Sequence, residues 1–337
     1  MFKSRRVPPW AGPLLLVAAL LLVGGAALFS LPGDGGVRFT NVAQVELPLP
    51  AASPNEQSHA SEAAPAGPPP PDPALLAQGP FGPLPQIAPD GRRPFFVYAR
   101  AFDFALARPH IAVLVLGLGL DARLTEQALS LPGTVSLSFS PYAPDLEKWF
   151  ARARETGHEV ILGLPVADDP AADAGPRALV ATASLEENRE RLEWVLARAP
   201  GYIALATRSD GFARSEPARL VLDVLAGRGL ALVEIASRGL RDLAHRVGLP
   251  YARAELLIEE APSALAVDYA LASLETEALE KGNALGAVRA YPVVLERLRA
   301  WAAALADKGL ALAPVSALVI ERSGLTSETP FGTSSQG

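Results

Sequence analysis

The chain of 337 residues contains no cysteine. This absence excludes disulfide bonds, thiol nucleophiles and thiolate metal ligands. Histidine occurs only four times, so a histidine-rich metal site is not expected. Basic residues are also in deficit, with 30 Lys and Arg against 36 Asp and Glu and a net charge of -6. No nucleic-acid partner is therefore expected, because such a binder needs a basic face.

No charged residue occurs between positions 6 and 34, and residues 14–31 form a nearly unbroken apolar run. About 20 apolar residues span a bilayer as a helix. Three of the first six residues are basic, which favours a cytoplasmic N-terminus. Residues 1–32 are thus predicted to form a cytoplasmic stub and a single-pass inner-membrane anchor, with the bulk of the chain periplasmic. A cleaved signal peptide is the alternative, since residues 24–27 are small.

Proline is unevenly distributed, and residues 48–94 hold 14 of the 32 prolines. Such a stretch has few apolar side chains to bury and is typical of an extended spacer. Residues 33–94 are therefore predicted to be a disordered linker rich in Pro and Ala. Residues 321–337 are mostly polar and predicted to be a disordered tail. The remaining residues, 95–320, are predicted to fold.

Short apolar runs alternate with amphipathic segments throughout residues 95–320, which is typical of β/α units. Continuous apolar runs favour parallel strands covered on both faces. Between them, Ser184 and Glu187 form the capping box of a helix. The expected fold is α/β, a (β/α) barrel, with a doubly wound open sheet as the alternative. The predicted strands are residues 110–117, 135–139, 160–164, 202–206, 230–235, 284–288 and 310–315.

Motifs in this region carry a resemblance to a known family. Their order and spacing are similar to those of the divergent polysaccharide deacetylases, with a barrel like that of chitooligosaccharide deacetylases, over residues 111–318. The motifs are Gly-Leu-Gly at 117–119, Leu-Pro-Gly at 131–133, residues 139–144, Gly-His-Glu at 157–159 with Leu-Pro at 164–165, Gly-Pro at 175–176, Arg-Gly-Leu at 228–230, Gly-Leu-Pro at 248–250, residues 284–292, Trp301 and Pro-Val-Ser at 314–316.

The resemblance implies an irregular (β/α) barrel and a metal-dependent hydrolase that removes acetyl groups from amino sugars. In such enzymes an aspartate and two histidines hold a divalent metal, often zinc, which polarises the amide carbonyl and activates water. A second aspartate is the general base, and a histidine can act as the acid. In a barrel these groups gather where strands end and the following loops begin.

The chemical positions of the family are replaced in this chain. By this resemblance, the positions of the family's paired aspartates are occupied here by Leu116 and Gly117. The position of one histidine is occupied by Gly163, and that of the late histidine by Arg289. The position of a further aspartate is occupied by Glu234, and that of an Asn-Asn-His segment by residues 206–208. Zinc needs His, Cys, Asp or Glu ligands, and arginine stays protonated. Neither a metal nor another cofactor is therefore expected, and no catalytic residue is assigned.

A few polar residues still follow predicted strand ends and are candidates for binding a ligand at the barrel mouth. Two arginines there can hold a carboxylate or phosphate bidentately, or they can pair with neighbouring carboxylates and join the loops. For Asp121 the competing interpretation is a helix N-cap, and for Asp168 it is a solvated turn. A structural role is expected for His158, because its turn lies at the opposite end of the barrel. The candidates are Asp121, Asp168, Arg208, Asp210, Glu234 and Arg289.

The main functional hypothesis is a degenerate, non-catalytic family member linked to carbohydrate and cell-envelope metabolism. It would bind peptidoglycan or another envelope glycan, or act as a scaffold. One alternative is an active carbohydrate deacetylase with a relocated site formed by Asp121, Asp168 and Glu234. Another is an interaction module that presents the barrel to envelope proteins.

Overall fold

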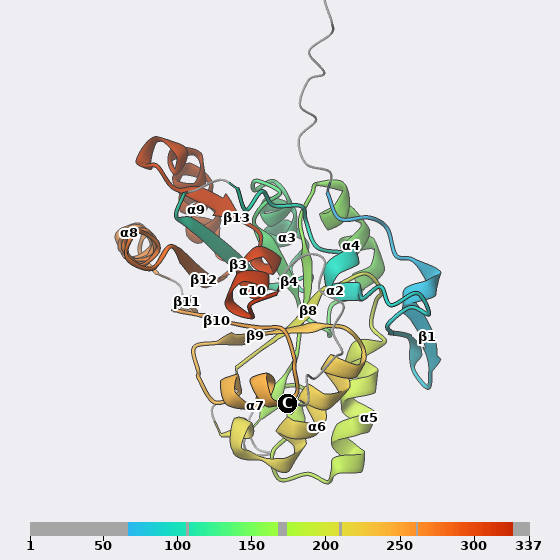
Figure 1. Cartoon of the computed structure of the whole chain (residues 1–337). Coiled ribbons are helices and arrows are strands. Elements are labelled where there is room, and N and C mark those ends of the chain that lie inside the picture. The colour runs from blue at the N-terminus through green and yellow to red at the C-terminus, as the bar shows by residue number, and fades with distance from the viewer. Residues whose placement is uncertain (1–66, 106–107, 168–173, 209–210, 261, 326–337) are drawn as a thin grey trace, which may run out of the picture. The chain divides into compact units, whose positions relative to one another are not determined.

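Parallel strands form the centre of the structure (Figure 1), a computed structural model that describes residues 67–105, 108–167, 174–208, 211–260 and 262–325. The predicted anchor lies outside these residues. Within them, no helix has both the length and the apolar character needed to cross a bilayer. The main-sheet strands are β3 (His110–Leu118), β4 (Ser136–Phe139), β5 (Val160–Gly163), β8 (Ala204–Thr207), β9 (Ala231–Ile235), β10 (Tyr251–Ala254), β11 (Leu256–Ile258), β12 (Asn283–Arg289) and β13 (Ala311–Ala313).

Eight of these strands are hydrogen-bonded in the order β10-β9-β8-β5-β4-β3-β12-β11, and every pair is parallel. β13 pairs with the amino half of β3. Because the strands follow one another in chain order around a ring, the sheet is a nearly closed barrel. The predicted barrel is confirmed, and the doubly wound open sheet, whose order reverses at a switch point, is not formed.

The ring is closed by one stretch of chain. β10 and β11 are separated only by Glu255, yet β10 pairs with β9 and β11 pairs with β12. Glu255 lies at this seam: its N–H donates to Leu285 O at 2.8 Å, and its carboxylate accepts from Leu285 N at 2.8 Å. The guanidinium of Arg322 donates to both Glu255 carboxylate oxygens, at 2.9 and 3.2 Å.

Alanine and larger apolar side chains together fill the interior of the barrel. One buried cluster contains Ala112, Ala204, Ala231, Ala252 and Ala287 from five of the strands, together with residues of α10 (Val315–Arg322). The larger cluster lies between the outer face of the strands and the helices. Two layers of apolar contacts therefore explain the continuous apolar runs in the sequence.

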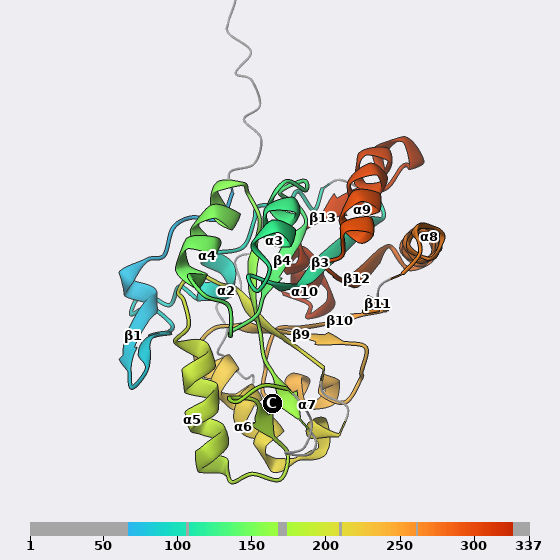
Figure 2. The same cartoon turned by 180° about the vertical axis from the view of Figure 1, so that it is seen from behind.

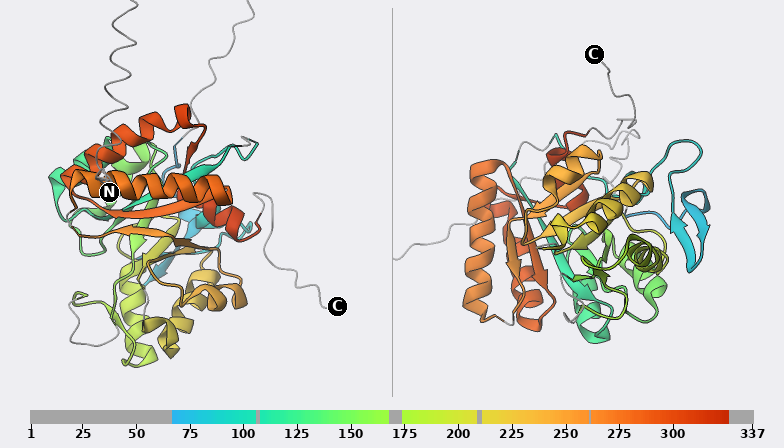
Figure 3. Two further views of the ribbon diagram at one scale, coloured as in Figure 1. Left: turned by 90° about the vertical axis from the view of Figure 1, so that its left-hand side faces the viewer. Right: turned by 90° about the horizontal axis from the view of Figure 1, so that it is seen from below.

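Helices cover the outer face of the sheet. Figures 1 and 2 show α5, α6 and α7 together at one side and α8 and α9 at another, and Figure 3 shows α8 lying along β12. The predicted capping box is present, because Glu187 N donates to Ser184 Oγ and Ser184 N donates to the Glu187 carboxylate. The helices are α3 (Ala122–Leu129), α4 (Leu146–Glu155), α5 (Leu185–Leu196), α6 (Glu216–Gly227), α7 (Arg241–Arg246), α8 (Ala264–Lys281) and α9 (Pro292–Ala304).

The predicted linker is wrong over its last part. Strands β1 (Leu76–Gly79) and β2 (Gly82–Pro85) form an antiparallel hairpin, and α2 (Pro94–Val97) follows. Leu75 and Leu84 are buried, and the Arg228 side chain donates to Pro85 O at 2.8 Å. Sparse apolar side chains therefore suffice when they dock onto an existing domain. The predicted tail also begins too early, since α10 continues to Arg322.

Polar contacts buried at the amino end of the barrel hold α10 in place. Glu159 directly precedes β5 and is fully buried. Its carboxylate accepts from Ser316 N at 3.1 Å, Arg100 N at 2.8 Å and Ser136 Oγ at 3.0 Å, and also from Ser316 Oγ. Glu159 thus satisfies an N–H in the first turn of α10 from another element of the fold. Burial raises the pKa of this carboxyl.

His158 has the structural role that the sequence predicts. It is fully buried, with Nδ1 at 2.7 Å from Val135 O and Nε2 at 3.3 Å from Leu129 O. Burial lowers the pKa of His158, which favours the neutral ring with one N–H. The shorter contact indicates that Nδ1 donates to Val135. The ring joins the β4 and β5 entrances and is not available to a ligand.

Candidate functional site

The carboxyl ends of the parallel strands meet at one mouth of the barrel, where the family chemistry is expected. Near the end of β3 lie the apolar Leu116 and the exposed Gly117. β5 ends at Gly163, and β12 ends at the exposed Arg289. None of these four side chains can ligate zinc. Among the described residues, moreover, no three His, Asp or Glu side chains gather in a way that could hold a metal ion.

Two of the predicted mouth carboxylates, Asp168 and Asp210, lie outside the described residues. Asp121 is exposed and caps α3, because its side chain accepts from Leu124 N at 3.0 Å. The helix-cap interpretation of Asp121 is therefore confirmed, since this carboxylate satisfies a free N–H of the first turn.

Arg208 joins two loops of the mouth. It forms an ion pair with Glu259, which follows β11. The hydroxyl of Tyr291 donates to Glu259 O at 3.0 Å, so the loops after β8, β11 and β12 are linked at this residue. The sequence left open whether Arg208 binds a ligand or pairs with a neighbouring carboxylate, and in the structure it pairs with Glu259. Arg289 is exposed and has no ion-pair or hydrogen-bond partner among the described side chains.

Glu234 is fully buried and holds the loop after β9. Its carboxylate accepts from Ser237 Oγ at 2.5 Å, Gly239 N at 2.9 Å and Leu240 N at 3.2 Å, and from the hydroxyl of Tyr251. Burial, followed by the hydrogen bond to Glu234, raises the pKa of Tyr251, which therefore stays a donor at neutral pH.

The direction of the Glu234 side chain corrects its assignment to the mouth. Its neighbours Val233 and Ile235 belong to the interior cluster, whereas Leu232 and Tyr251 belong to the cluster under the helices. Because side chains alternate along a strand, Glu234 points toward the helices and away from the barrel interior. Arg208, Arg289 and Glu234 thus follow the same end of the sheet without forming one site.

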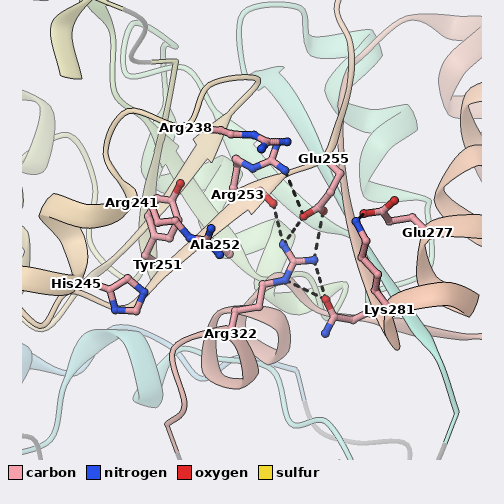
Figure 4. A pocket seen from close by; sticks show the side chains of 11 residues that line it. Arg238, Arg241, His245, Tyr251, Ala252, Arg253, Glu255, Glu277, Lys281 and Arg322 are labelled. Atoms are coloured by element: carbon pink, nitrogen blue, oxygen red, sulfur yellow. Dashed lines mark hydrogen bonds and ion pairs between the residues drawn. The ribbon is translucent and has the colours of Figure 1, made fainter. Parts of the chain in front are cut away.

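A pocket of about 580 Å³ lies between α7, α8 and α10, next to the seam of the barrel. The sequence does not predict this pocket, because its residues come from several distant segments. The one local signal is the group of basic residues at 238–246. We call this site the basic pocket (Figure 4); it is lined by Arg238, Arg241, His245, Tyr251, Ala252, Arg253, Glu255, Glu277, Lys281, Asn283 and Arg322.

Comparison with known proteins decides the family. The model for divergent polysaccharide deacetylases matches residues 113–319, which is most of the barrel. The chain belongs to the divergent polysaccharide deacetylase family. The sequence resemblance is thereby confirmed. No curated protein matches the chain.

Solved structures include a similar protein. An uncharacterized protein from Agrobacterium tumefaciens C58 is 28% identical, with a TM-score of 0.67, over 70% of this chain and 99% of its own. A putative cellobiose-phosphate cleavage protein from Enterococcus faecalis V583 is 13% identical over 63% of this chain and 99% of its own. Its TM-score of 0.47 is too low to support a conclusion.

Membership of the divergent polysaccharide deacetylase family raises the question of a metal. The described strand ends supply Leu116, Gly117, Gly163 and Arg289, and Glu234 points toward the helices. This donor set does not fit the aspartate and two histidines of a deacetylase metal site. No reaction step through a metal is therefore derived for this family member.

Proposed function

We propose that this protein is a non-catalytic carbohydrate-binding member of its family that acts at the cell envelope. Family membership supports a carbohydrate-related function. The observation that carries the non-catalytic part is the replacement of ligands at the barrel mouth by Leu116, Gly117, Gly163 and Arg289. Arg208 and Arg289 are two cationic residues at this mouth, and we propose that they contact an envelope glycan such as peptidoglycan.

The proposed location follows from the sequence alone. An apolar run at residues 14–31 after a basic N-terminus is typical of an inner-membrane anchor. We propose that the barrel is held on the periplasmic side of the membrane by this run. A barrel tethered there would meet peptidoglycan or envelope proteins without diffusing away.

Glycan binding is tested by a pull-down with isolated peptidoglycan. The wild-type chain should be retained, and the double variant Arg208→Ala and Arg289→Ala should be lost from the pellet. The pair of Arg208 with Glu259 is exposed and worth at most about 1 kcal/mol, so the variant is expected to fold. Arg123→Ala with Arg189→Ala is the matched control, because it removes two exposed arginines from α3 and α5. Equal retention of both double variants would refute a role for the mouth arginines.

Absence of catalysis is tested separately. We expect calorimetric titration with zinc, manganese, cobalt and nickel to show no saturable site, and N-acetylated oligosaccharides to release no acetate. Saturable metal binding together with acetate release would contradict the proposal and establish an active deacetylase.

A further inference from the structure

We propose that the basic pocket binds a small phosphate-bearing ligand. Five Lys and Arg side chains and two carboxylates line it, and these seven groups carry a net charge of +3 in a chain whose net charge is -6. Charges of one sign in a concave surface raise the local concentration of counter-ions. A volume of about 580 Å³ lies within the range of small-molecule sites.

The directions of the cations favour a tetrahedral anion over a carboxylate. Arg238 and Arg241 belong to the loop after β9 and to α7, Arg253 to β10 and Lys281 to the end of α8. In Figure 4, Lys281 lies on one side of the pocket and His245 on the other. A planar carboxylate matches one arginine fork in its own plane, whereas a phosphate presents oxygens in several directions. Cations on different walls therefore suit a phosphate by their charge, although Lys281 is paired with Glu277 and Arg253 with Glu255.

Two of the cations are available for such a ligand. Arg238 and Arg241 are exposed and have no hydrogen-bond or ion-pair partner among the described residues. Arg322, by contrast, is engaged by Glu255 and Asn283 and closes the seam. Arg322 thus contributes charge to the floor of the pocket, while Arg238 and Arg241 donate hydrogen bonds to the ligand.

The loop that carries Arg238 is held in place by hydrogen bonds to the buried side chain of Glu234. The buried Glu234 carboxylate accepts hydrogen bonds on both sides of Arg238, from Ser237 Oγ and from Gly239 N. Ala236 adopts a φ of +59°, a left-handed conformation that is strained for a residue with a side chain. Interactions of Glu234 outweigh this strain, so Glu234 is a positioning residue of the basic pocket.

The residues proposed to contact a glycan, Arg208 and Arg289, do not line the basic pocket, although Arg238 of the pocket follows β9 at the mouth end of the sheet. Asn283 of the pocket and Arg289 of the mouth are the two ends of β12. A strand rises about 3.3 Å per residue, which separates their backbones by roughly 20 Å. The phosphate proposal therefore does not depend on the proposed function, and each can fail alone.

The full chain is titrated calorimetrically with inorganic phosphate, with glucose 6-phosphate and with glucose. We expect one saturable site for both phosphates and none for glucose. Arg238→Ala with Arg241→Ala should weaken binding at least about tenfold, because two charge-assisted hydrogen bonds are lost. Arg123→Ala with Arg189→Ala should bind as tightly as wild type. No saturable phosphate binding, or equal affinity in both double variants, would overturn the proposal.

Two further arms distinguish the ligand source and the role of Glu234. Binding to phosphatidic acid vesicles without binding to either soluble phosphate would replace the proposal by a membrane contact. Glu234→Ala should weaken phosphate binding, and Glu234→Gln, which keeps an oxygen toward the loop amides, should restore it. Val195→Ala in α5 is the control for a general loss of stability. If Glu234→Ala and Val195→Ala weaken phosphate binding equally, Glu234 has no positioning role.

The pocket double variant and the mouth double variant are each measured in the other's assay as well. Arg238→Ala with Arg241→Ala should keep its retention on peptidoglycan, and Arg208→Ala with Arg289→Ala should keep its phosphate affinity. If either mouth or pocket substitutions abolish both activities, the two sites are not separate and the phosphate proposal is wrong.

Discussion

Replacing Glu159 by glutamine is expected to destabilise the barrel by about 1–3 kcal/mol. The two carboxylate oxygens accept from different backbone donors, Arg100 N and Ser316 N. A glutamine side chain has only one oxygen, so in either orientation its NH₂ group faces one of these donors. The serine hydroxyls can rotate to adapt, but a backbone N–H cannot. One buried N–H therefore loses its partner, and its desolvation sets the cost.

The assay is thermal unfolding of the full chain. For a domain of this size, 1 kcal/mol shifts Tm by about 2–4 °C, so the expected loss is about 2–12 °C. Glu187→Gln is the matched control, because Glu187 accepts from Ser184 N and Ser184 Oγ through the same oxygen. Glutamine keeps that oxygen and is compatible with a capping box, so its Tm should be unchanged. Equal Tm values for Glu159→Gln and wild type would refute the reasoning.

The pH dependence gives Glu159 a second signature. Burial raises its pKa in the folded state above the ordinary 4.5, so the folded chain binds a proton more readily than the unfolded chain. The contribution of Glu159 to stability is therefore fully present below pH 4.5 and declines as pH rises through the folded-state pKa. The stability difference between wild type and Glu159→Gln should shrink with rising pH in that window. A difference that grows with pH would show that the sign is wrong.

Three smaller effects are expected. Burial lowers the pKa of His158 below the ordinary 6.5, so wild-type stability should be retained above pH 6.5 and fall below it, and urea unfolding of His158→Asn should lack that slope. Asp121→Ala should cost about 1 kcal/mol of unfolding free energy through the lost cap without changing retention on peptidoglycan, and a loss of retention would restore Asp121 to the site. Gly282→Ala should lower stability by about 1–2 kcal/mol in denaturant titrations, because Gly282 has a φ of +87° and nothing within 4 Å of the added Cβ, and an unchanged midpoint would contradict this.

Most of the barrel could be predicted because its strands are continuous apolar runs. The seam strands β10 and β11 escaped prediction because Arg253 and Glu255 interrupt residues 251–258, so this segment lacks such a run. The hairpin escaped because proline and glycine dominate its composition, and its burial depends on the surface of a domain that sequence patterns do not display.

The candidate site was predicted only in part. Strand ends could be located from the apolar runs, which correctly placed Arg208, Glu234 and Arg289 at one end of the sheet. The direction of each side chain could not be predicted, because a shift of one residue in a strand exchanges the side chains that face the barrel interior with those that face the helices. The basic pocket required the C-terminus of α8 and Arg322 to meet α7, and no spacing in the sequence indicates that meeting.

The barrel is closed at the seam by a single short segment, β11. Detaching residues 255–258 from β12 breaks one strand pair, made of three residue pairs, and the contacts of Glu255, while β9 keeps its pairing with β10. Amide hydrogen exchange at Leu285 and Ile258 should therefore report local opening of the barrel at the seam. Arg253, Glu255 and Arg322 line the basic pocket on both sides of the seam. A ligand bound in the pocket would therefore stabilise the closed barrel and slow this opening.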